Sequence, residues 1–267
     1  MLLNYRENEM RKHKTALITG ASGGLGLEFA RILAKKKYNL LLVARNEGKL
    51  YFIKNDLESK YGIDVYVYAA DLSKVDAALD VFNYTLEHDI NVDVLINNAG
   101  FGDAGSFADS DWQKQYEMVQ LNVIALMQLT HCFLNTMIEQ GHGKILNMSS
   151  VAAFSAGPYM SIYYATKEFV RSFSEAVSEE VKGTGVTVTA FCPGPTATGF
   201  EQAASMDNGS TMFRKAAKAE DVAKGGIRAM MRGKALSYYG GYTKCMSFMC
   251  RLVSRSVARK YAARMNQ

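Results

Sequence analysis

The stretch Thr19-Gly20-Ala21-Ser22-Gly23-Gly24-Leu25-Gly26 decides how this chain is interpreted. It follows a short apolar run at 14–19, typical of a buried strand, and leads into a helical pattern at 25–36. The glycines let the backbone turn sharply and approach a ligand without a Cβ clash. The helix that follows presents unpaired N–H groups and a positive dipole end, which suit a pyrophosphate. A tight strand–helix turn with no ligand is the alternative, and the position after a first strand favours the phosphate loop.

The rest of the chain repeats this strand–helix alternation. Short apolar runs without hairpin signals are typical of parallel strands covered by helices on both faces. We therefore predict one α/β domain over residues 1–267, a three-layer doubly wound parallel sheet of about seven strands with helices on both faces. The predicted strands are 14–19, 39–43, 64–69, 92–97, 144–148, 186–191 and 236–239, and the predicted helices are 25–36, 46–60, 73–88, 111–139, 162–182, 220–232 and 242–265.

Composition excludes several classes of protein. The chain has 267 residues and a mass of 29.5 kDa, with 48% hydrophobic and 21% charged residues, so it is neither disordered nor fibrous. The four cysteines form no CxxC pair, so we expect no structural metal site and no disulfide framework. Free thiols favour a reducing, cytoplasmic compartment. Residues 1–14 lack the apolar core of a signal peptide. No uninterrupted apolar run approaches the roughly 20 residues of a membrane span.

The net charge of +5 is unevenly distributed. Residues 222–267 hold ten Lys or Arg and no Asp or Glu, so the preceding 221 residues sum to −5. Within the segment 242–267, Arg251, Arg255 and Arg259 recur every four residues, which predicts a helix with one basic and one apolar face. Three interpretations remain open: a packed terminal helix with a solvated cationic face, a site for an anionic substrate tail, or peripheral membrane contact. Nucleic acid is not expected as a partner, because the rest of the chain is acidic.

Further motifs follow the strands in order. They are Asp71-Leu72-Ser73 after the third strand, Asn97-Asn98-Ala99-Gly100 after the fourth, and Ser149-Ser150 after the fifth, followed by Tyr163-Tyr164-Ala165-Thr166-Lys167 in the next helix, and Pro193-Gly194 after the sixth strand. With the loop at 19–26 and Asn122 in the long helix, they resemble the short-chain dehydrogenase/reductase family over residues 14–240. The resemblance implies a Rossmann-type oxidoreductase that binds a nicotinamide cofactor.

Tyr163 and Lys167 lie four residues apart, hence on one helical face. A Tyr followed by Lys at this spacing is expected about once by chance in such a chain. The pair is therefore informative only because of its position, in the helix after the fifth strand and 13 residues after Ser150. A nearby ammonium favours the phenolate, and a positively charged oxidised nicotinamide would act the same way, so we expect the pKa of Tyr163 to be lowered toward neutral pH. Tyr163 would then act as general acid in ketone reduction or as general base in alcohol oxidation.

The resemblance assigns roles to the other members of this set. Ser150 would hydrogen-bond the substrate oxygen, with Ser149 as the competitor, and Asn122 would hold a water on a proton relay through Lys167. A structural alternative for Asn122 is an amide satisfied by neighbouring backbone. Tyr159 and Tyr164 flank the site without a Lys four residues on, and the role of Tyr164 stays open. The predicted catalytic residues are Asn122, Ser150, Tyr163 and Lys167.

The residue after the second strand indicates which nicotinamide is bound. An NAD site places an Asp or Glu there, whereas a 2′-phosphate needs a cation. The chain reads Val43-Ala44-Arg45, so Arg45 predicts NADP(H), with a ribose contact from Glu47 as the alternative. Asp71 would accept from the adenine amino group or act as a local cap. The predicted cofactor-binding residues are Gly20, Ser22, Gly24, Leu25, Gly26, Arg45, Asp71, Leu72, Asn98, Ala99, Gly100, Tyr163, Lys167, Pro193, Gly194 and Thr198.

Together these observations predict an NADP(H)-dependent oxidoreductase that interconverts a ketone and a secondary alcohol. Residues 195–218 would form a lid, whose Phe200, Met206, Met212 and Phe213 favour an apolar substrate such as a 3-oxoacyl thioester or a steroid-like carbonyl. By the resemblance, the protein forms a homo-oligomer, a dimer or tetramer joined through its long helices. The alternative is a non-catalytic NADP(H)-binding regulatory or scaffold protein, which has no need of the Tyr–Lys pair.

Overall fold

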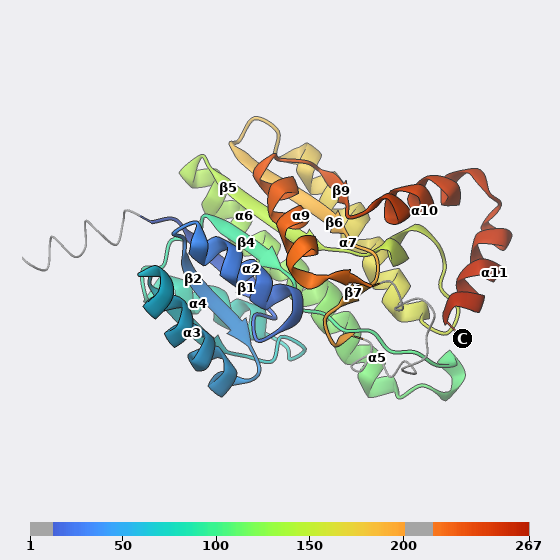
Figure 1. The fold of residues 1–267 in the computed structure, drawn as a ribbon, viewed down its shortest axis with the longest axis horizontal. Helices are drawn as coiled ribbons and strands as arrows, with labels where there is room; N and C mark the ends of the chain where they lie inside the picture. Colours follow the sequence, from blue (N-terminus) through green and yellow to red (C-terminus); the bar gives the residue numbers. More distant parts are fainter. Residues whose placement is uncertain (1–12, 201–215, 267) are drawn as a thin grey trace, which may run out of the picture.

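The apolar runs of the sequence form one seven-stranded sheet in the computed structural model, which describes residues 13–200 and 216–266 (Figure 1). The strand order is β3-β2-β1-β4-β5-β6-β9, and every adjacent pair is parallel. This confirms the predicted doubly wound parallel sheet. The strands are β1 Thr15–Thr19, β2 Asn39–Ala44, β3 Val65–Ala69, β4 Val94–Asn97, β5 Gly143–Met148, β6 Val186–Cys192 and β9 Leu236–Tyr238.

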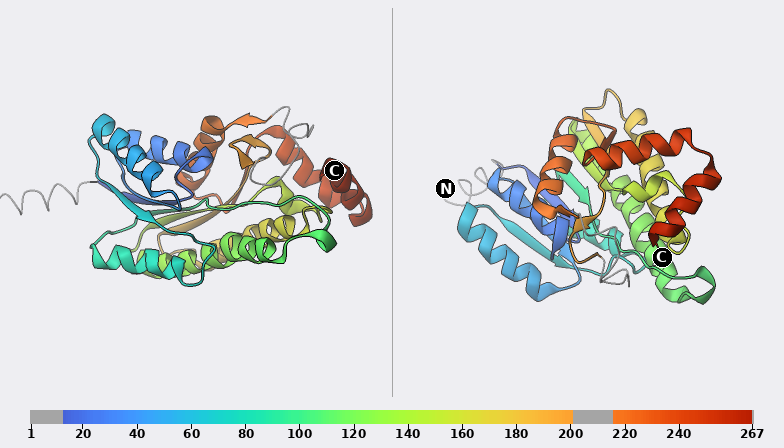
Figure 2. Two further views of the ribbon diagram at one scale, coloured as in Figure 1. Left: turned by 90° about the horizontal axis from the view of Figure 1, so that it is seen from below. Right: turned by 45° about the vertical axis from the view of Figure 1, so that its right-hand side comes forward.

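Helices cover both faces of this sheet, which gives the three layers seen edge-on in Figure 2. On one face lie α2 Gly24–Lys35, α3 Glu47–Tyr61 and α9 Ala219–Met231; on the other lie α4 Ala77–Glu87, α6 Leu126–Gln140 and α7 Ser161–Glu180. Two further helices, α10 Gly241–Leu252 and α11 Arg255–Asn266, close the chain at one end of the molecule (Figure 1).

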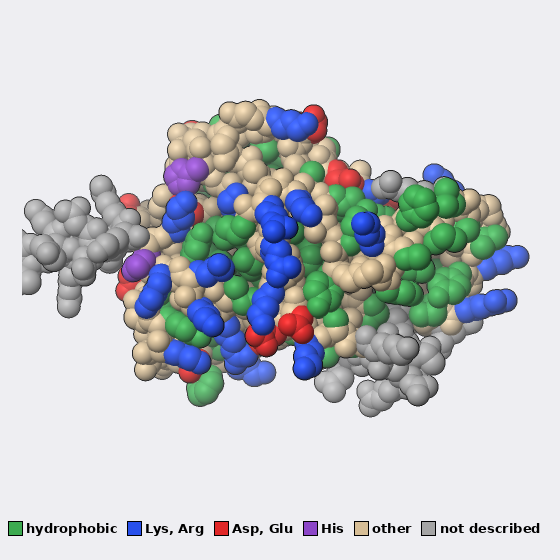
Figure 3. Space-filling view, turned by 45° about the horizontal axis from the view of Figure 1, so that its top comes forward, with side chains coloured by type: hydrophobic (Ala, Val, Ile, Leu, Met, Phe, Trp, Pro, Cys, Tyr) green, Lys and Arg blue, Asp and Glu red, His purple; other side chains and the backbone are tan. Residues whose placement is uncertain are grey.

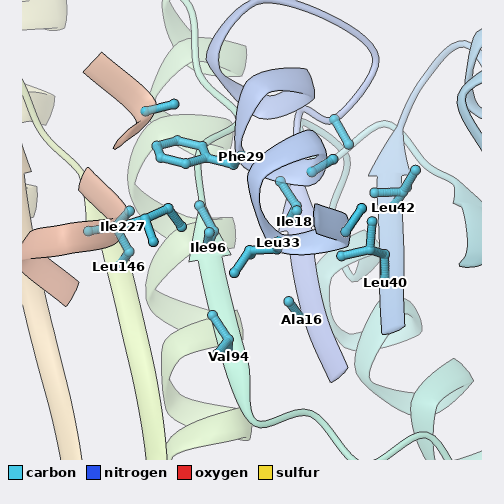
Figure 4. Close-up of a cluster of buried hydrophobic side chains, with 14 of the residues drawn as sticks. Ala16, Ile18, Phe29, Leu33, Leu40, Leu42, Val94, Ile96, Leu146 and Ile227 are labelled. Carbon is cyan, nitrogen blue, oxygen red and sulfur yellow. The ribbon is translucent and has the colours of Figure 1, made fainter. Parts of the chain in front are cut away.

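Alternate residues of each strand enter opposite cores, because successive side chains of a strand point to opposite faces. Ile18 and Leu42 pack with Phe29 of α2 and Ile227 of α9 (Figure 4), while Leu17 joins the core on the other face. All five residues of β1 are buried, so its run is apolar without alternation. This arrangement is the reason why the strands could be located from apolar runs alone.

The direction of winding reverses at the centre of the sheet. The chain proceeds from β1 to β2 on one side and resumes at β4 on the other side of β1. The loops that follow β1 and β4 therefore run in opposite directions from the carboxyl ends of these strands and leave a crevice between them. The motifs that follow the strands lie in loops or early helical turns at this edge, whereas Asn122 lies inside the long helix.

The predicted helix at 111–139 is continuous but contains a π-helical segment. It consists of α5 Trp112–Val119, the π-helix Gln120–Ala125 and α6. By length and composition alone the helix Trp112–Gln140 could span a membrane, because it contains an 18-residue stretch with a mean hydropathy of 1.3. One face of it is buried against the sheet, where Leu129 and Phe133 belong to the core, as in the covering helix of an α/β protein.

Two helix boundaries differ from the prediction. The helix expected at 73–88 begins only at Ala77, because Asp71 and Ser73 form a local hydrogen-bonded turn. The single helix expected at 242–265 is two helices, because Val253 is extended and the Ser254 Oγ accepts from the backbone N–H of Val257 at the start of α11. The expectation of one basic stripe through 251, 255 and 259 is therefore wrong, since the break separates residue 251 from the other two.

The predicted lid at 195–218 lies partly outside the described residues. Its two ends pair in a small parallel sheet of β7 Thr196–Ala197 and β8 Ala217–Lys218. The predicted substrate contacts Met206, Met212 and Phe213 fall outside the described residues, whereas Phe200 is described.

Candidate functional site

The glycine loop is built from two backbone segments in close approach. A Cβ at Gly26 would lie 2.1 Å from the carbonyl oxygen of Gly20, so this position requires glycine. Gly20 itself has φ 66°, a left-handed conformation that glycine adopts without strain. The N-cap of α2 is Gly23, no side chain caps the helix, and its first turn holds no acidic residue. The positive end of α2 therefore faces the crevice and suits an anion.

Asn98 holds this loop against the end of β4. Its side-chain nitrogen donates to the carbonyl oxygen of Thr19 at 2.9 Å, and its backbone N–H donates to the Thr19 hydroxyl at 3.0 Å. The backbone N–H of Ala99 shares the same hydroxyl at 3.0 Å. Asn98 thus positions the phosphate loop through its side chain, in addition to lining the crevice.

Two cavities of about 590 Å³ and 670 Å³ follow the carboxyl edge of the strands. They share the glycine loop and the turn after β4, and so form one cleft. The first cavity is lined by these predicted residues: Gly20, Ser22, Gly24, Leu25, Asn98, Ala99, Gly100, Ser150, Tyr163, Lys167, Pro193, Gly194 and Thr198. The second is lined by Arg45, Asp71 and Leu72 as well as the shared loops.

Cations mark one end of the cleft. Arg45 directly follows β2, and Lys49 lies in the first turn of α3, which Asn46 caps by accepting from the Lys49 N–H at 2.9 Å. Both cations are exposed and line the cavity, and the preceding Ala44 offers no carboxylate. This end of the cleft fits a phosphate better than a ribose diol.

Asp71 lies across the same cavity. Its Oδ1 accepts from the backbone N–H and the hydroxyl of Ser73, at 3.0 and 2.7 Å. Burial opposes ionisation, but the Ser73 hydrogen bonds and the positive charges of Arg45 and Lys74 lower the pKa of Asp71 below its usual range. Asp71 is therefore a charged acceptor, and Asp76 rather than Asp71 precedes helix α4.

Ser150, Tyr163 and Lys167 meet at the other end of the cleft. The hydroxyls of Ser150 and Tyr163 share a hydrogen bond. The Lys167 Nζ lies 5.8 Å from the centre of the Tyr163 ring and donates to the carbonyl oxygen of Met148 at 3.0 Å. The competing Ser149 is buried and donates to the carbonyl oxygen of Lys167 at 2.8 Å, so its hydroxyl is used within the fold.

Burial shifts both titrating groups away from their charged forms. It raises the pKa of Tyr163 to about 12, although the Ser150 hydrogen bond acts in the opposite direction. It lowers the pKa of Lys167 to about 8. In the protein alone, desolvation of the phenolate therefore keeps the pKa of Tyr163 above its usual value, opposite to the shift expected from Lys167 and an oxidised nicotinamide together.

Two predicted residues lie behind the cleft instead of lining it. Gly26 contacts the loop backbone from below, as its approach to Gly20 shows. Asn122 is fully buried in the π-helix, with its Oδ1 accepting from the Phe101 N–H at 3.1 Å and its Nδ2 donating to the Phe101 carbonyl at 2.9 Å. Its side chain thus has the backbone partners of the structural alternative, and it supports the turn beside Lys167, where a Cβ at Gly100 would approach both side chains.

Apolar side chains surround Tyr163 on the side away from the glycine loop. The ring of Phe200 lies 5.3 Å from that of Tyr163, and Val151 and Met160 line the same cavity. Tyr164 also lines the cavity, and its hydroxyl donates to the Asn266 Oδ1 at 3.1 Å. Asn266 in turn donates to the carbonyl oxygen of Pro158 at 2.8 Å and lines the cavity. Helix α11 therefore supplies part of the cavity wall.

The described residues contain no cluster of three or more His, Cys, Asp or Glu side chains that could hold a metal ion. The four cysteines are all free thiols.

Sequence reasoning missed several residues of the cleft, among them Lys49, Val151, Met160 and Asn266. Lys49 had a usable signal, since it stands four residues after Arg45 at a helix start that Asn46 caps. Asn266 had none, because 102 residues separate it from Tyr164 and only the fold brings them together.

Comparisons with known proteins agree with this geometry. A family model described as short chain dehydrogenase matches residues 14–209. A very-long-chain 3-oxoacyl-CoA reductase of Laccaria bicolor is 36% identical over 188 residues, covering 69% of this chain and 55% of the relative. A 7beta-hydroxysteroid dehydrogenase of Collinsella aerofaciens is 31% identical, covering 68% of each chain. The chain thus spans about half the length of the first of these relatives.

Among solved structures, a short-chain dehydrogenase from Sphingobium yanoikuyae in complex with NADPH has a TM-score of 0.80 at 28% identity. The match covers 90% of this chain and 94% of that one. Because the family model matches most of the chain and the first of these relatives is 36% identical to it, the chain belongs to the short-chain dehydrogenase family.

Proposed function

We propose that this protein is an NADP(H)-dependent oxidoreductase that interconverts a ketone and a secondary alcohol. One observation carries the proposal: a single cleft holds Arg45 at one end, the Ser150–Tyr163–Lys167 group at the other, and the uncapped helix N-terminus with Lys49 along its length. The first set suits a dinucleotide with an additional phosphate. The second set suits proton transfer to or from a carbonyl oxygen.

The residues fit the cofactor along the whole cleft. The backbone at 20–26 would face the pyrophosphate, Asp71 would accept from the adenine, and Arg45 with Lys49 would bind the 2′-phosphate. The nicotinamide, when bound, supplies or accepts the hydride. NADPH in the Sphingobium yanoikuyae structure supports this assignment.

Tyr163 would transfer the proton. Because its pKa in the protein is about 12, the phenol is protonated near neutral pH and is ready to donate to a carbonyl oxygen. Ser150, already hydrogen-bonded to Tyr163, would bind the same oxygen and stabilise the charge that develops on it. Lys167 would stabilise the phenolate left after transfer, and a water held beside Asn122 would return the proton by way of Lys167.

The test is turnover with a panel of ketones and alcohols, followed by the absorbance of NADPH. Tyr163→Phe should abolish turnover while NADPH still binds. Tyr159→Phe is the matched control, since Tyr159 stands four residues earlier with a partly exposed ring. Wild-type protein that binds NADPH but turns over no member of the panel would contradict the proposal and favour a non-catalytic binding protein.

The substrate is proposed to be apolar near its carbonyl group. Val151, Met160 and Phe200 line the cavity beside Tyr163, and contact with them favours alkyl or ring carbons. The names of the relatives, a very-long-chain 3-oxoacyl-CoA reductase and a 7beta-hydroxysteroid dehydrogenase, support bulky apolar carbonyl compounds. A kcat/KM that rises with the alkyl chain length of a ketone series would agree, and a preference for short polar ketones would contradict it.

The long helices are the proposed contact of a homo-oligomer. Val119, Ile124 and Ile138 on α5 to α6, together with Phe169 on α7, are exposed on the outer face of that layer. Burial of such side chains against a second copy is favourable. Ile124→Lys should lower the mass measured by light scattering, whereas Phe52→Lys, on α3, should not. The four free thiols are consistent with the proposed cytoplasmic compartment.

A further inference from the structure

The outer surface of the last two helices combines exposed apolar side chains with unpaired cations. We define the α10–α11 face by these exposed residues: apolar Tyr242, Phe248, Met249, Leu252, Val257 and Tyr261, and basic Lys244, Arg255, Arg259, Lys260 and Arg264. Leu252 is 66% exposed and Phe248 59%. Figure 3 shows hydrophobic side chains gathered where α10 and α11 lie in Figure 1, with Lys and Arg projecting beside them.

The two helices form one surface in spite of the break at 253–254. The Tyr261 hydroxyl of α11 lies close enough to the Tyr242 hydroxyl of α10 to raise the pKa of Tyr242. The inner side of α11 is fixed by the buried Ala262 and by the bonds of Asn266 to Tyr164 and Pro158. The exposed side chains are therefore held outward by a packed inner side.

The charge of this face has one sign. None of its five cations forms an ion pair with a described residue, and the sequence has no Asp or Glu after Asp221. A second row of exposed cations lines a neighbouring surface cavity: Arg228 on α9, and Arg232 and Lys234, which follow the end of that helix. In Figure 3 a column of Lys and Arg side chains runs over α9, on the same side of the molecule as the α10–α11 face.

We propose that the α10–α11 face docks on an anionic lipid bilayer. Exposed Phe, Leu and Tyr side chains beside Lys and Arg are the composition that enters the interface of a membrane with anionic headgroups. A second copy of this chain is a less suitable occupant, because a symmetric contact would bring identical cationic faces together. The bilayer instead supplies both the apolar layer and the negative charge that this face lacks.

Docking would place the membrane beside the substrate end of the cleft. Asn266 lines the cavity next to Tyr163 and Phe200, and it belongs to the helix whose outer side is to meet the lipid. This consequence rests on the proposed function, since it assumes that an apolar carbonyl compound enters there. The docking itself does not depend on catalysis and is tested without substrate.

The test is sedimentation of the full chain with vesicles. Vesicles of phosphatidylcholine alone are compared with vesicles in which phosphatidylglycerol replaces part of it. We expect binding to the anionic vesicles only. Raising the salt from about 0.1 M to about 1 M should release the protein, because the Debye length falls from about 10 Å to about 3 Å.

Two sets of variants assign the binding to this face. The triple variant Arg255→Gln, Arg259→Gln, Lys260→Gln should lower the partition coefficient by about 100-fold, since each cation near an anionic surface contributes about fivefold. The double variant Phe248→Ser, Leu252→Ser should lower it by about 10-fold or more. The control for the basic set is the triple variant Lys35→Gln, Lys36→Gln, Lys60→Gln, and the control for the apolar set is the double variant Phe52→Ser, Leu86→Ser. Both controls change exposed residues in or next to α2 to α4.

Equal binding to neutral and anionic vesicles, or an equal loss in the control variants, would overturn the proposal. A shift of the double variant from dimer to monomer, with vesicle binding unchanged, would assign the face to a second copy instead. NADPH turnover of a water-soluble ketone, measured on the same proteins without vesicles, separates this question from the proposed activity. A protein that turns over substrate but does not pellet refutes the docking alone.

Discussion

The hydroxyl of Tyr164 donates a hydrogen bond to the side-chain oxygen of Asn266 at 3.1 Å, and so joins α7 to α11 across 102 residues of chain. The neighbouring residue, Tyr163, shares a hydrogen bond with Ser150 at the end of the cleft, with its ring edge-on to that of Tyr164 at 6.2 Å. Both adjacent tyrosines line the cavity, and they differ in their partners: Tyr163 lies beside Ser150, whereas Tyr164 fixes the helix that forms part of the wall.

Tyr164→Phe removes only this donor. We expect the free energy of unfolding to fall by about 1–2 kcal/mol, because the buried Asn266 oxygen loses its partner. The KM for an apolar ketone should rise while the KM for NADPH stays unchanged, since α11 borders the substrate end. Thermal melting and steady-state kinetics measure both. Tyr159→Phe is the control, and an equal effect in that variant would argue against the Asn266 contact.

The pH dependence should differ between the two directions of reaction. The pKa of Tyr163 is raised to about 12, so near neutral pH the phenol is protonated and the phenolate is scarce. Carbonyl reduction uses the phenol and should be level through neutral pH. Alcohol oxidation uses the phenolate and should rise by about tenfold per pH unit until the pKa is reached.

Initial rates in both directions across neutral and alkaline pH test this expectation. A bound oxidised nicotinamide would shift the midpoint downward, but it would not invert the slopes. An oxidation rate that falls as the pH rises would contradict Tyr163 as the proton-transferring group.

The cations at the end of β2 should decide the choice of cofactor. Arg45→Ala and Lys49→Ala are each expected to lower the preference for NADPH over NADH by about 10- to 100-fold, the contribution of one hydrogen bond to a charged group. The measurement is kcat/KM with each cofactor. Lys60→Ala, at the far end of α3, is the control. Unmutated protein that prefers NADH would refute the assignment of NADP(H).

The glycine loop offers a matched pair of substitutions. Gly26→Ala places a Cβ 2.1 Å from the Gly20 carbonyl oxygen, and the loop or α2 must move at a cost of about 3 kcal/mol or more. Gly23→Ala meets nothing within 4 Å and should cost at most about 1 kcal/mol. Denaturant unfolding compares the two. Similar losses of stability would show that the close approach at Gly26 is not what requires glycine.

The expected shift of the Tyr163 pKa failed because that pKa depends on a balance between burial and nearby polar groups. The spacing of Tyr163 and Lys167 on one helical face was predicted from two sequence positions. The direction of the Tyr163 pKa was not, because the Nζ bonds to Met148 and both groups lose solvent, and neither effect is visible in the spacing. The break at Ser254 was likewise not predicted. Ser254 begins a new helix, α11, whose direction is set by the contact of Asn266 with Tyr164, and that contact joins residues far apart in the sequence.

By itself, the sequence determined the sheet and the line of motifs along its edge. Strands such as β1 are buried on both faces, so an unbroken apolar run marks them, and each motif follows such a run locally. Only the tertiary structure decided that Asn266 borders the cleft, that Asn122 supports it from behind, and that α10 and α11 present one apolar and basic surface. These features depend on contacts between residues far apart in the chain. The local sequence pattern does not indicate which distant side chain will form a hydrogen bond with a given buried polar group.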